Sequence, residues 1–185
     1  YSYAVNDVYN RTLSSRKDFK KAYIRNVLNS MNKKAEIPEN PILIGSISRL
    51  IDHYKNSFIL KSLIKLCDER KDVFLLFKGE NPKSDNFDKE FFSLVDSLRD
   101  KPWFLYDDKR SPMPEIFEIY SCLDANIFAG AVGNASAEMA GLGVPLILVD
   151  HETNRSMFQN IAMFFQKEDS SGLSTRVKTF ISMTE

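Results

Sequence analysis

The sequence lacks the features of membrane-spanning and disulfide-stapled proteins. Its longest apolar run, from Val144 to Val149, is far shorter than the roughly 20 residues that a membrane helix needs. The first residues contain no short apolar segment of the signal-peptide kind. Cys67 and Cys122, the only cysteines, each lie in an apolar helix-like pattern, which favours reduced, packed thiols over disulfides. We therefore expect a cytoplasmic protein.

Net charge is also absent, because 25 basic residues balance 25 acidic ones. The balance is uneven: residues 1–36 contain eight Lys or Arg and three acids. We interpret residues 1–36 as a basic helical arm and linker, with two prolines in the stretch 33–41, and residues 37–185 as one domain. The basic charge fits a solvated helix face or, alternatively, peripheral contact with the inner face of a membrane. No pattern typical of nucleic-acid binding is present.

Beyond the linker, buried strand patterns alternate with amphipathic helix patterns across short connections. This alternation predicts an α/β fold: a Rossmann-like parallel sheet of five to six strands with helices on both faces. Such sheets bind ligands at the carboxyl ends of their strands, where loops lead into helix N-termini. The expected strands are 42–48, 72–79, 103–106, 125–130 and 144–149, and the expected helices are 17–31, 54–69, 88–100, 113–124, 138–142, 156–163 and 170–183.

Glycine is scarce, with seven in the chain, yet four of them fall within residues 128–150. Gly130 and Gly133, with small neighbours such as Asn134, would let backbone amides at a helix N-terminus approach a phosphate. We expect Glu138 in the first turn of that helix. Its negative charge excludes it as a phosphate ligand and suits the vicinal diol of a ribose. Alternatively, Glu138 only stabilises the helix dipole and the glycines only permit close packing.

Two cations, Arg49 and Lys55, follow the first strand in "GSISRLIDHYKNS", on the same carboxyl edge. Arginine bidentately and lysine as a point charge would together grip a diphosphate. His53 lies between them and is a further candidate contact for a sugar or a phosphate, the alternative being a solvated loop histidine. No metal is expected, because no Asp-x-Asp pair follows a strand and "YDDK" is a contiguous pair in a polar turn.

In their order along the chain, four segments resemble the nucleotide-sugar-binding C-terminal domain of GT-B-fold glycosyltransferases, especially the group 1 enzymes, over about Ile42 to Ile181. They are "ILIGSISRLIDHYKNSFILKSLIKL", "DVFLLFKGE", "WFLYDDKRSPMPEIFEIYSCLDANIFAG" and "ASAEMAGLGVPLILVD". The segment "EMAGLGVP" is similar to the family's pattern of glutamate, alanine, methionine, alanine, small, glycine, small and proline. After the first strand the family residues are matched by Arg49, Leu50 and Lys55, whereas Ser48 and Asn56 stand where glycines are usual.

The resemblance implies a role for each candidate residue. Arg49 and Lys55 would hold the donor diphosphate together with the backbone at Gly133 and Asn134, and Glu138 would hold the donor ribose.

The resemblance also implies a nucleobase contact through the backbone near Tyr106 and Asp107. Group 1 enzymes usually have another glutamate near the sugar, eight positions before the one that matches Glu138, and here that position is Gly130. This departure leaves the stereochemical outcome open, between retention and inversion, and Gly130 itself is a candidate donor contact.

By this resemblance the chain is the donor-binding domain of a glycosyltransferase, which moves a sugar from a nucleoside diphosphate sugar to a saccharide or lipid-linked acceptor, as in polysaccharide biosynthesis, without a cofactor. The catalytic base and the acceptor site would come mainly from an N-terminal domain, so the chain alone is expected to be inactive. Because the chain begins with Tyr1, we expect that domain to precede it. A nucleotide-sugar 2-epimerase and a catalytically silent binding module are the alternatives.

Overall fold

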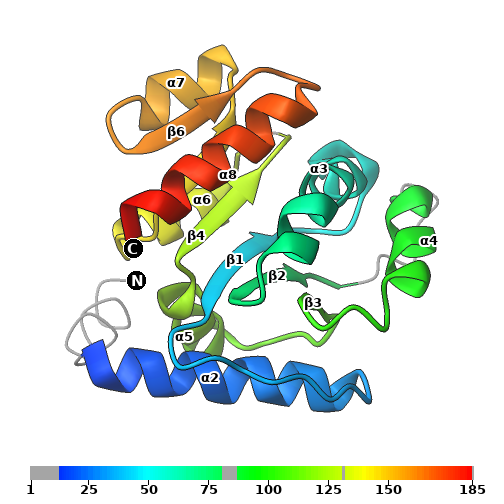
Figure 1. Ribbon diagram of the computed structural model, residues 1–185. Coiled ribbons are helices and arrows are strands. Elements are labelled where there is room, and N and C mark those ends of the chain that lie inside the picture. Colours follow the sequence, from blue (N-terminus) through cyan, green and yellow to red (C-terminus); the bar gives the residue numbers. More distant parts are fainter. Residues whose placement is uncertain (1–12, 81–86, 131, 185) are drawn as a thin grey trace.

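The protein, described here from a computed structural model that covers residues 13–80, 87–130 and 132–184, is built on a six-stranded, all-parallel sheet (Figure 1). The strand order is β3-β2-β1-β4-β5-β6, so the chain reverses its direction of winding between β1 and β4. This is the point at which Rossmann-like sheets bind ligands. The strands are β1 (Ile42–Ile47), β2 (Val73–Lys78), β3 (Phe104–Asp107), β4 (Ala125–Phe128), β5 (Leu146–Val149) and β6 (Ala162–Phe165). The predicted fold class is confirmed.

Helices cover both faces of the sheet (Figure 1). On one face, α3, α4 and α8 pack over residues such as Leu75 and Ile147; on the other, α2, α5 and α6 pack over residues such as Phe74 and Leu146. Sheet residues are buried from both sides, which explains their continuous apolar runs. The helices are α2 (Leu13–Ser30), α3 (Asn56–Glu69), α4 (Lys89–Ser97), α5 (Met113–Cys122), α6 (Asn134–Gly141), α7 (Glu152–Phe158) and α8 (Ser170–Thr184), with a 3₁₀ turn η1 (Asp52–Tyr54) before α3.

Helix α2 shares the core of the sheet. Its residues Tyr23, Ile24, Val27 and Leu28 are buried in the same apolar cluster as Phe74 and contribute to the packing of α2 against α5. The basic residues of α2 lie on its remaining faces. The proposed boundary at residue 36 stays a prediction, but the described part of the arm contributes four buried residues to the core.

The end of the chain differs from the sequence prediction. Residues 156–163 were expected to form a helix, whereas α7 ends at Phe158 and Ala162–Phe165 form the sixth strand, β6, paired with β5. That prediction was wrong because a short apolar run such as "AMFF" has no periodicity that separates a strand from a helix. The segment is a strand because it pairs with β5, a contact that its own sequence does not indicate.

Two further features agree with the composition. Cys67 and Cys122 are both buried and form no disulfide. No helix within the described ranges is long and apolar enough to cross a membrane.

Candidate functional site

Two neighbouring cavities lie at the carboxyl edge of the sheet. The larger, of about 520 Å³, lies over the ends of β4 and β5, and the smaller, of about 230 Å³, over the ends of β1 and β2. The β1–α3 loop contributes to both: Ser48 and Arg49 line the smaller cavity, whereas Asp52, His53 and Lys55 line the larger. Arg49 and Lys55, the two cations predicted from the sequence, therefore lie on one loop but line different cavities.

The smaller cavity combines cations with an apolar wall. Arg49 is exposed and stacks its guanidinium 5.9 Å from the centre of the Tyr54 ring. Lys78, Lys109 and Arg110 line the cavity from the ends of β2 and β3, where Lys78 is paired with Asp107 and Arg110 with Glu80. The apolar wall comes from Ile47, Ile116 and Tyr120. This composition suits a ligand with a flat apolar part and a negatively charged part, such as a nucleotide.

Lys55 in the larger cavity occupies an unusual backbone position. It is the N-cap residue of α3, with a left-handed φ of 55° and no side-chain cap hydrogen bond. Its Nζ lies 3.0 Å from Asp52 Oδ2, and both side chains are largely exposed. His53 stacks edge-on to Tyr54 at 5.4 Å between ring centres and is exposed at the rim of the cavity.

The N-terminus of α6 faces open space. Gly133 is its N-cap, nothing lies within 4 Å of the position that a Cβ would take there, and both Gly133 and Asn134 are exposed. The Ser136 hydroxyl accepts a hydrogen bond from Gly133 N–H and donates one to Gly133 O. The described geometry leaves room for an anion over this turn.

Glu138 lies in the second turn of α6, not in the first, because the helix begins at Asn134. That part of the sequence prediction was wrong, since the small residues 134–136 are already helical. The carboxylate is half-buried, and this burial raises its pKa. Burial, and then the negative charge of Glu138, raise the pKa of Tyr120 to about 12. Tyr120 lines the smaller cavity, so Glu138 lies near that cavity without being part of its lining.

Gly130 is required by a close approach of two loops. A Cβ at this position would overlap the carbonyl oxygen of His53 and lie 3.0 Å from the Cα of Tyr54. The loop after β4 thus packs directly on the backbone of η1, and no side chain fits between them without a shift. Gly130 can serve a ligand only through its backbone.

Tyr106 and Asp107 direct their side chains elsewhere. The Tyr106 ring packs against Phe92, with 6.3 Å between ring centres, and its N–H donates to the sulfur of Met31. Asp107 Oδ2 accepts hydrogen bonds from Lys78 Nζ and from the hydroxyl of Tyr23, both at 2.7 Å. A nucleobase contact through their backbone stays a prediction.

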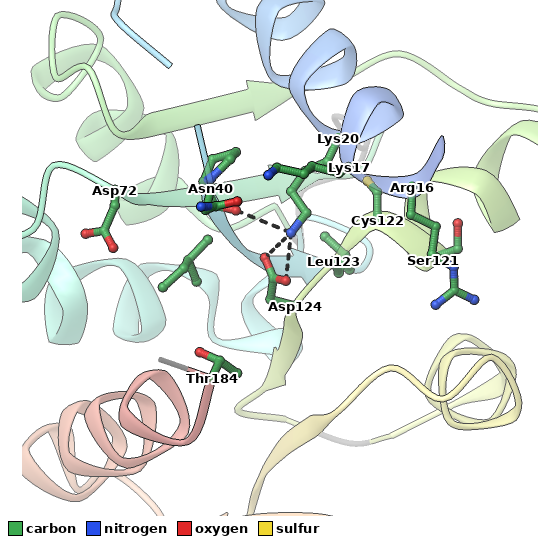
Figure 2. A pocket seen from close by; sticks show the side chains of 12 residues that line it. Arg16, Lys17, Lys20, Asn40, Asp72, Ser121, Cys122, Leu123, Asp124 and Thr184 are labelled. Atoms are coloured by element: carbon green, nitrogen blue, oxygen red, sulfur yellow. Dashed lines mark hydrogen bonds and ion pairs between the residues drawn. The ribbon is translucent and has the colours of Figure 1, made fainter. Parts of the chain in front are cut away.

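A cavity of about 660 Å³, larger than either of these, lies at the opposite, amino edge of the sheet beside α2 (Figure 2). Figure 2 shows Lys20 reaching Asp124, whose two carboxylate oxygens it binds at 2.6 and 2.7 Å. Lys17, on the same wall, forms an ion pair of 3.6 Å with Glu39. These two cations are paired with carboxylates, as Lys55 is with Asp52, so the argument against this cavity is its position: parallel sheets of this kind bind ligands at the carboxyl edge.

Several residues of the carboxyl edge were missed by sequence reasoning. Lys78 carried a signal: it is a charged residue at the end of an otherwise apolar strand pattern. Lys109 and Arg110 follow "YDD" in a polar turn, where charged residues are common and do not by themselves indicate a site. Lys167 and Glu168 of the β6–α8 loop line the larger cavity. Because β6 was not predicted, this loop was not placed at the carboxyl edge. Among the described residues, no group of three or more His, Cys, Asp or Glu is placed to hold a metal.

The fold corresponds to one half of a GT-B glycosyltransferase. HepE from Anabaena, in complex with UDP, has a TM-score of 0.72 and 14% identity, and the match covers 98% of this chain and 46% of HepE. A glycosyltransferase from Rickettsia africae has a TM-score of 0.70 and 16% identity, covering 97% of this chain and 45% of that one. Trehalose-6-phosphate synthase from Burkholderia multivorans has a TM-score of 0.67 and 11% identity, and the match covers 91% of this chain and 40% of the synthase.

These comparisons confirm the resemblance at the level of the fold. The chain spans less than half of the length of each of these proteins. The sequence matches no protein-family model, and no curated protein sequence is significantly similar to it. What the chain binds and catalyses therefore has to be argued from its own residues.

Proposed function

We propose that this chain is the donor-binding half of a glycosyltransferase, which binds a nucleoside diphosphate sugar across the two cavities of the carboxyl edge. A second domain would supply the acceptor, a saccharide or a lipid-linked saccharide. The observation that best supports the proposal is the position of Lys55.

Lys55 is unfavourable for the stability of the fold in two ways. A non-glycine residue in a left-handed conformation costs on the order of 1 kcal/mol. A cation at a helix N-terminus also opposes the positive end of the helix dipole. The exposed pair with Asp52 offsets little of this, because such pairs contribute only about 0–1 kcal/mol. A bound anion, held between Lys55 and Arg49, explains both costs.

The ligand follows from the neighbours of these cations. The apolar wall of the smaller cavity would take the nucleobase, and Glu138, which lies near Tyr120 of that wall, would accept hydrogen bonds from the ribose hydroxyls. The diphosphate would lie along the β1–α3 loop and the open N-terminus of α6, with Arg49 and Lys55 on either side. The UDP complexes of HepE favour uridine as the base.

The transfer reaction places new negative charge where these groups lie. As the bond between the anomeric carbon and the diphosphate oxygen breaks, the electron pair stays on the leaving oxygen. Fixed cations and helix amides that face this oxygen stabilise the transition state more than the ground state. The acceptor hydroxyl attacks the anomeric carbon and gives its proton to a base from the second domain. We expect the reaction to need no metal.

The proposal is tested by calorimetric titration of the chain with UDP, GDP, ADP and uridine. Arg49→Ala should weaken diphosphate binding by roughly tenfold or more, with little effect on uridine, because it removes a charged hydrogen bond. Glu138→Gln should weaken uridine and UDP alike. Arg99→Ala, a change in a surface pair with Asp96, is the matched control. Binding of no diphosphate at millimolar concentration would contradict the proposal and favour the catalytically silent module.

A further inference from the structure

The larger cavity contains a carboxylate that the fold does not use. Four carboxylates line this cavity within the described residues, and three of them have cationic partners: Asp52 with Lys55, Glu90 with Lys61 and Asp150 with Arg155. The fourth, Glu168, is exposed at the cavity and has no hydrogen-bond or ion-pair partner in the part of the chain that the structure describes.

Glu168 also occupies a backbone position that favours another residue. Asp169 N–H donates to Gln166 O at 3.1 Å, which closes a turn, and Glu168 is the third residue of this turn with a φ of 59°. Glycine or asparagine is the usual residue at such a position, because a side chain is disfavoured there. Asp169 caps α8 through its bond to Gly172 N–H, so the turn and the helix start do not depend on the Glu168 carboxylate.

The two left-handed residues of the carboxyl edge line the same cavity. Within the described chain, the non-glycine residues with positive φ are Asn32, Lys55 and Glu168, and only the last two are at this edge. One carries a cation at the β1 side of the cavity and the other an anion at the β6 side. Backbone strain of this kind collects at ligand sites, where it holds side chains in productive positions. Gly130, between them on the cavity wall, offers no side chain.

We propose that the 520 Å³ cavity is the glycosyl subsite and that Glu168 accepts hydrogen bonds from hydroxyls of the donor sugar. This inference rests on the proposed function, because Lys55 fixes the phosphate end of the same ligand. A carboxylate is the acceptor that best pairs with two sugar hydroxyls at once. Lys55 and Glu168 both line this cavity, whose volume of about 520 Å³ lies within the usual range for small-molecule sites.

The test compares binding of UDP with UDP-glucose, and of GDP with GDP-mannose, by calorimetry on the whole chain. The sugar should increase the affinity of the wild-type chain for at least one nucleotide. Glu168→Gln and Glu168→Gly should each remove most of that increase, a loss of roughly tenfold, and leave binding of the diphosphates unchanged. Glu168→Gly should also keep or raise the thermal midpoint, because glycine suits the turn. Glu152→Gln, an exposed first-turn acid of α7 outside the cavity lining, is the control.

Each outcome bears on a different step. A sugar-dependent increase that survives both Glu168 variants would overturn the role of Glu168. Equal binding of diphosphates and nucleotide sugars by the wild-type chain would overturn the glycosyl subsite. Failure to bind any diphosphate would overturn the proposed function, and this inference with it.

Discussion

Lys78 is the residue whose replacement should most clearly separate structure from function at this edge. It ends β2 with 2% of its surface exposed, and its ammonium lies 2.7 Å from Asp107 Oδ2 and 2.9 Å from the carbonyl oxygen of Lys109. Asp107 also accepts the hydroxyl of Tyr23 from α2. One buried ion pair therefore joins two strand ends, the loop that carries Lys109, and a helix on the sheet face.

Lys78→Met removes the cation and keeps most of the side-chain volume. The carboxylate of Asp107 then stays buried without its charge partner, and breaking a buried pair in this way costs roughly 3–5 kcal/mol. In a chain of this length each kcal/mol lowers the melting temperature by about 2–4 °C, so the expected decrease is on the order of 6–20 °C. Lys61→Met removes a cation from an exposed pair with Glu90 and should cost only about 0–1 kcal/mol.

Urea unfolding followed by circular dichroism measures both variants. A double variant, Lys78→Met with Asp107→Leu, should recover part of the loss, because both buried charges are then gone. If Lys78→Met is no less stable than Lys61→Met, the buried pair does not organise this edge and our reasoning about it fails. UDP binding by a folded Lys78→Met chain would show whether the Lys109 loop has also moved.

Two further predictions concern the thiols and the activity of the chain. Burial raises the pKa of both Cys67 and Cys122 to about 12, so at pH 8 they should react with a disulfide reagent only as fast as the protein opens, and rapidly in denaturant. Stability should fall as pH rises from about 9 towards 12, because the unfolded thiols lose protons first. The chain alone should not transfer sugar from UDP-glucose to a saccharide acceptor, because near-attack geometry also needs an acceptor-binding domain. Turnover by the chain alone would refute this.

The sheet could be predicted because its strands are buried on both faces. Continuous apolar runs such as "VFLLF" in β2 need no partner to be recognised, and every residue of β2 is buried. The edge strand β6 lacks this signal, since three of its four residues are only half-buried. The start of α6 was misplaced for a related reason: its small residues serve equally in a loop and in a helix.

The site could be predicted only where position along the chain implies position in space. Arg49 and Lys55 follow a strand, so they must lie at its carboxyl edge. The partner of Lys78 is 29 residues away, and the left-handed φ of Glu168 leaves no trace in its residue type. The first depends on the pairing of β2 with β3 and the second on a local turn, and composition and periodicity encode neither. Neither residue was predicted as part of the site, yet Lys78 lines the smaller cavity and Glu168 the larger.

Cations at the two edges of the sheet lie next to opposite ends of the helix dipoles. Helices such as α5 end at the amino edge, where the negative end of the dipole favours cations, and Lys20 there is already held by Asp124. Helices such as α3 and α6 begin at the carboxyl edge, where the same dipoles repel Arg49 and Lys55. The positive charge of Lys20 at the amino edge is therefore stabilised within the fold. At the carboxyl edge the helix dipoles oppose Lys55, and a bound anion would compensate, which is the physical basis for our proposal that the diphosphate binds on this side of the sheet.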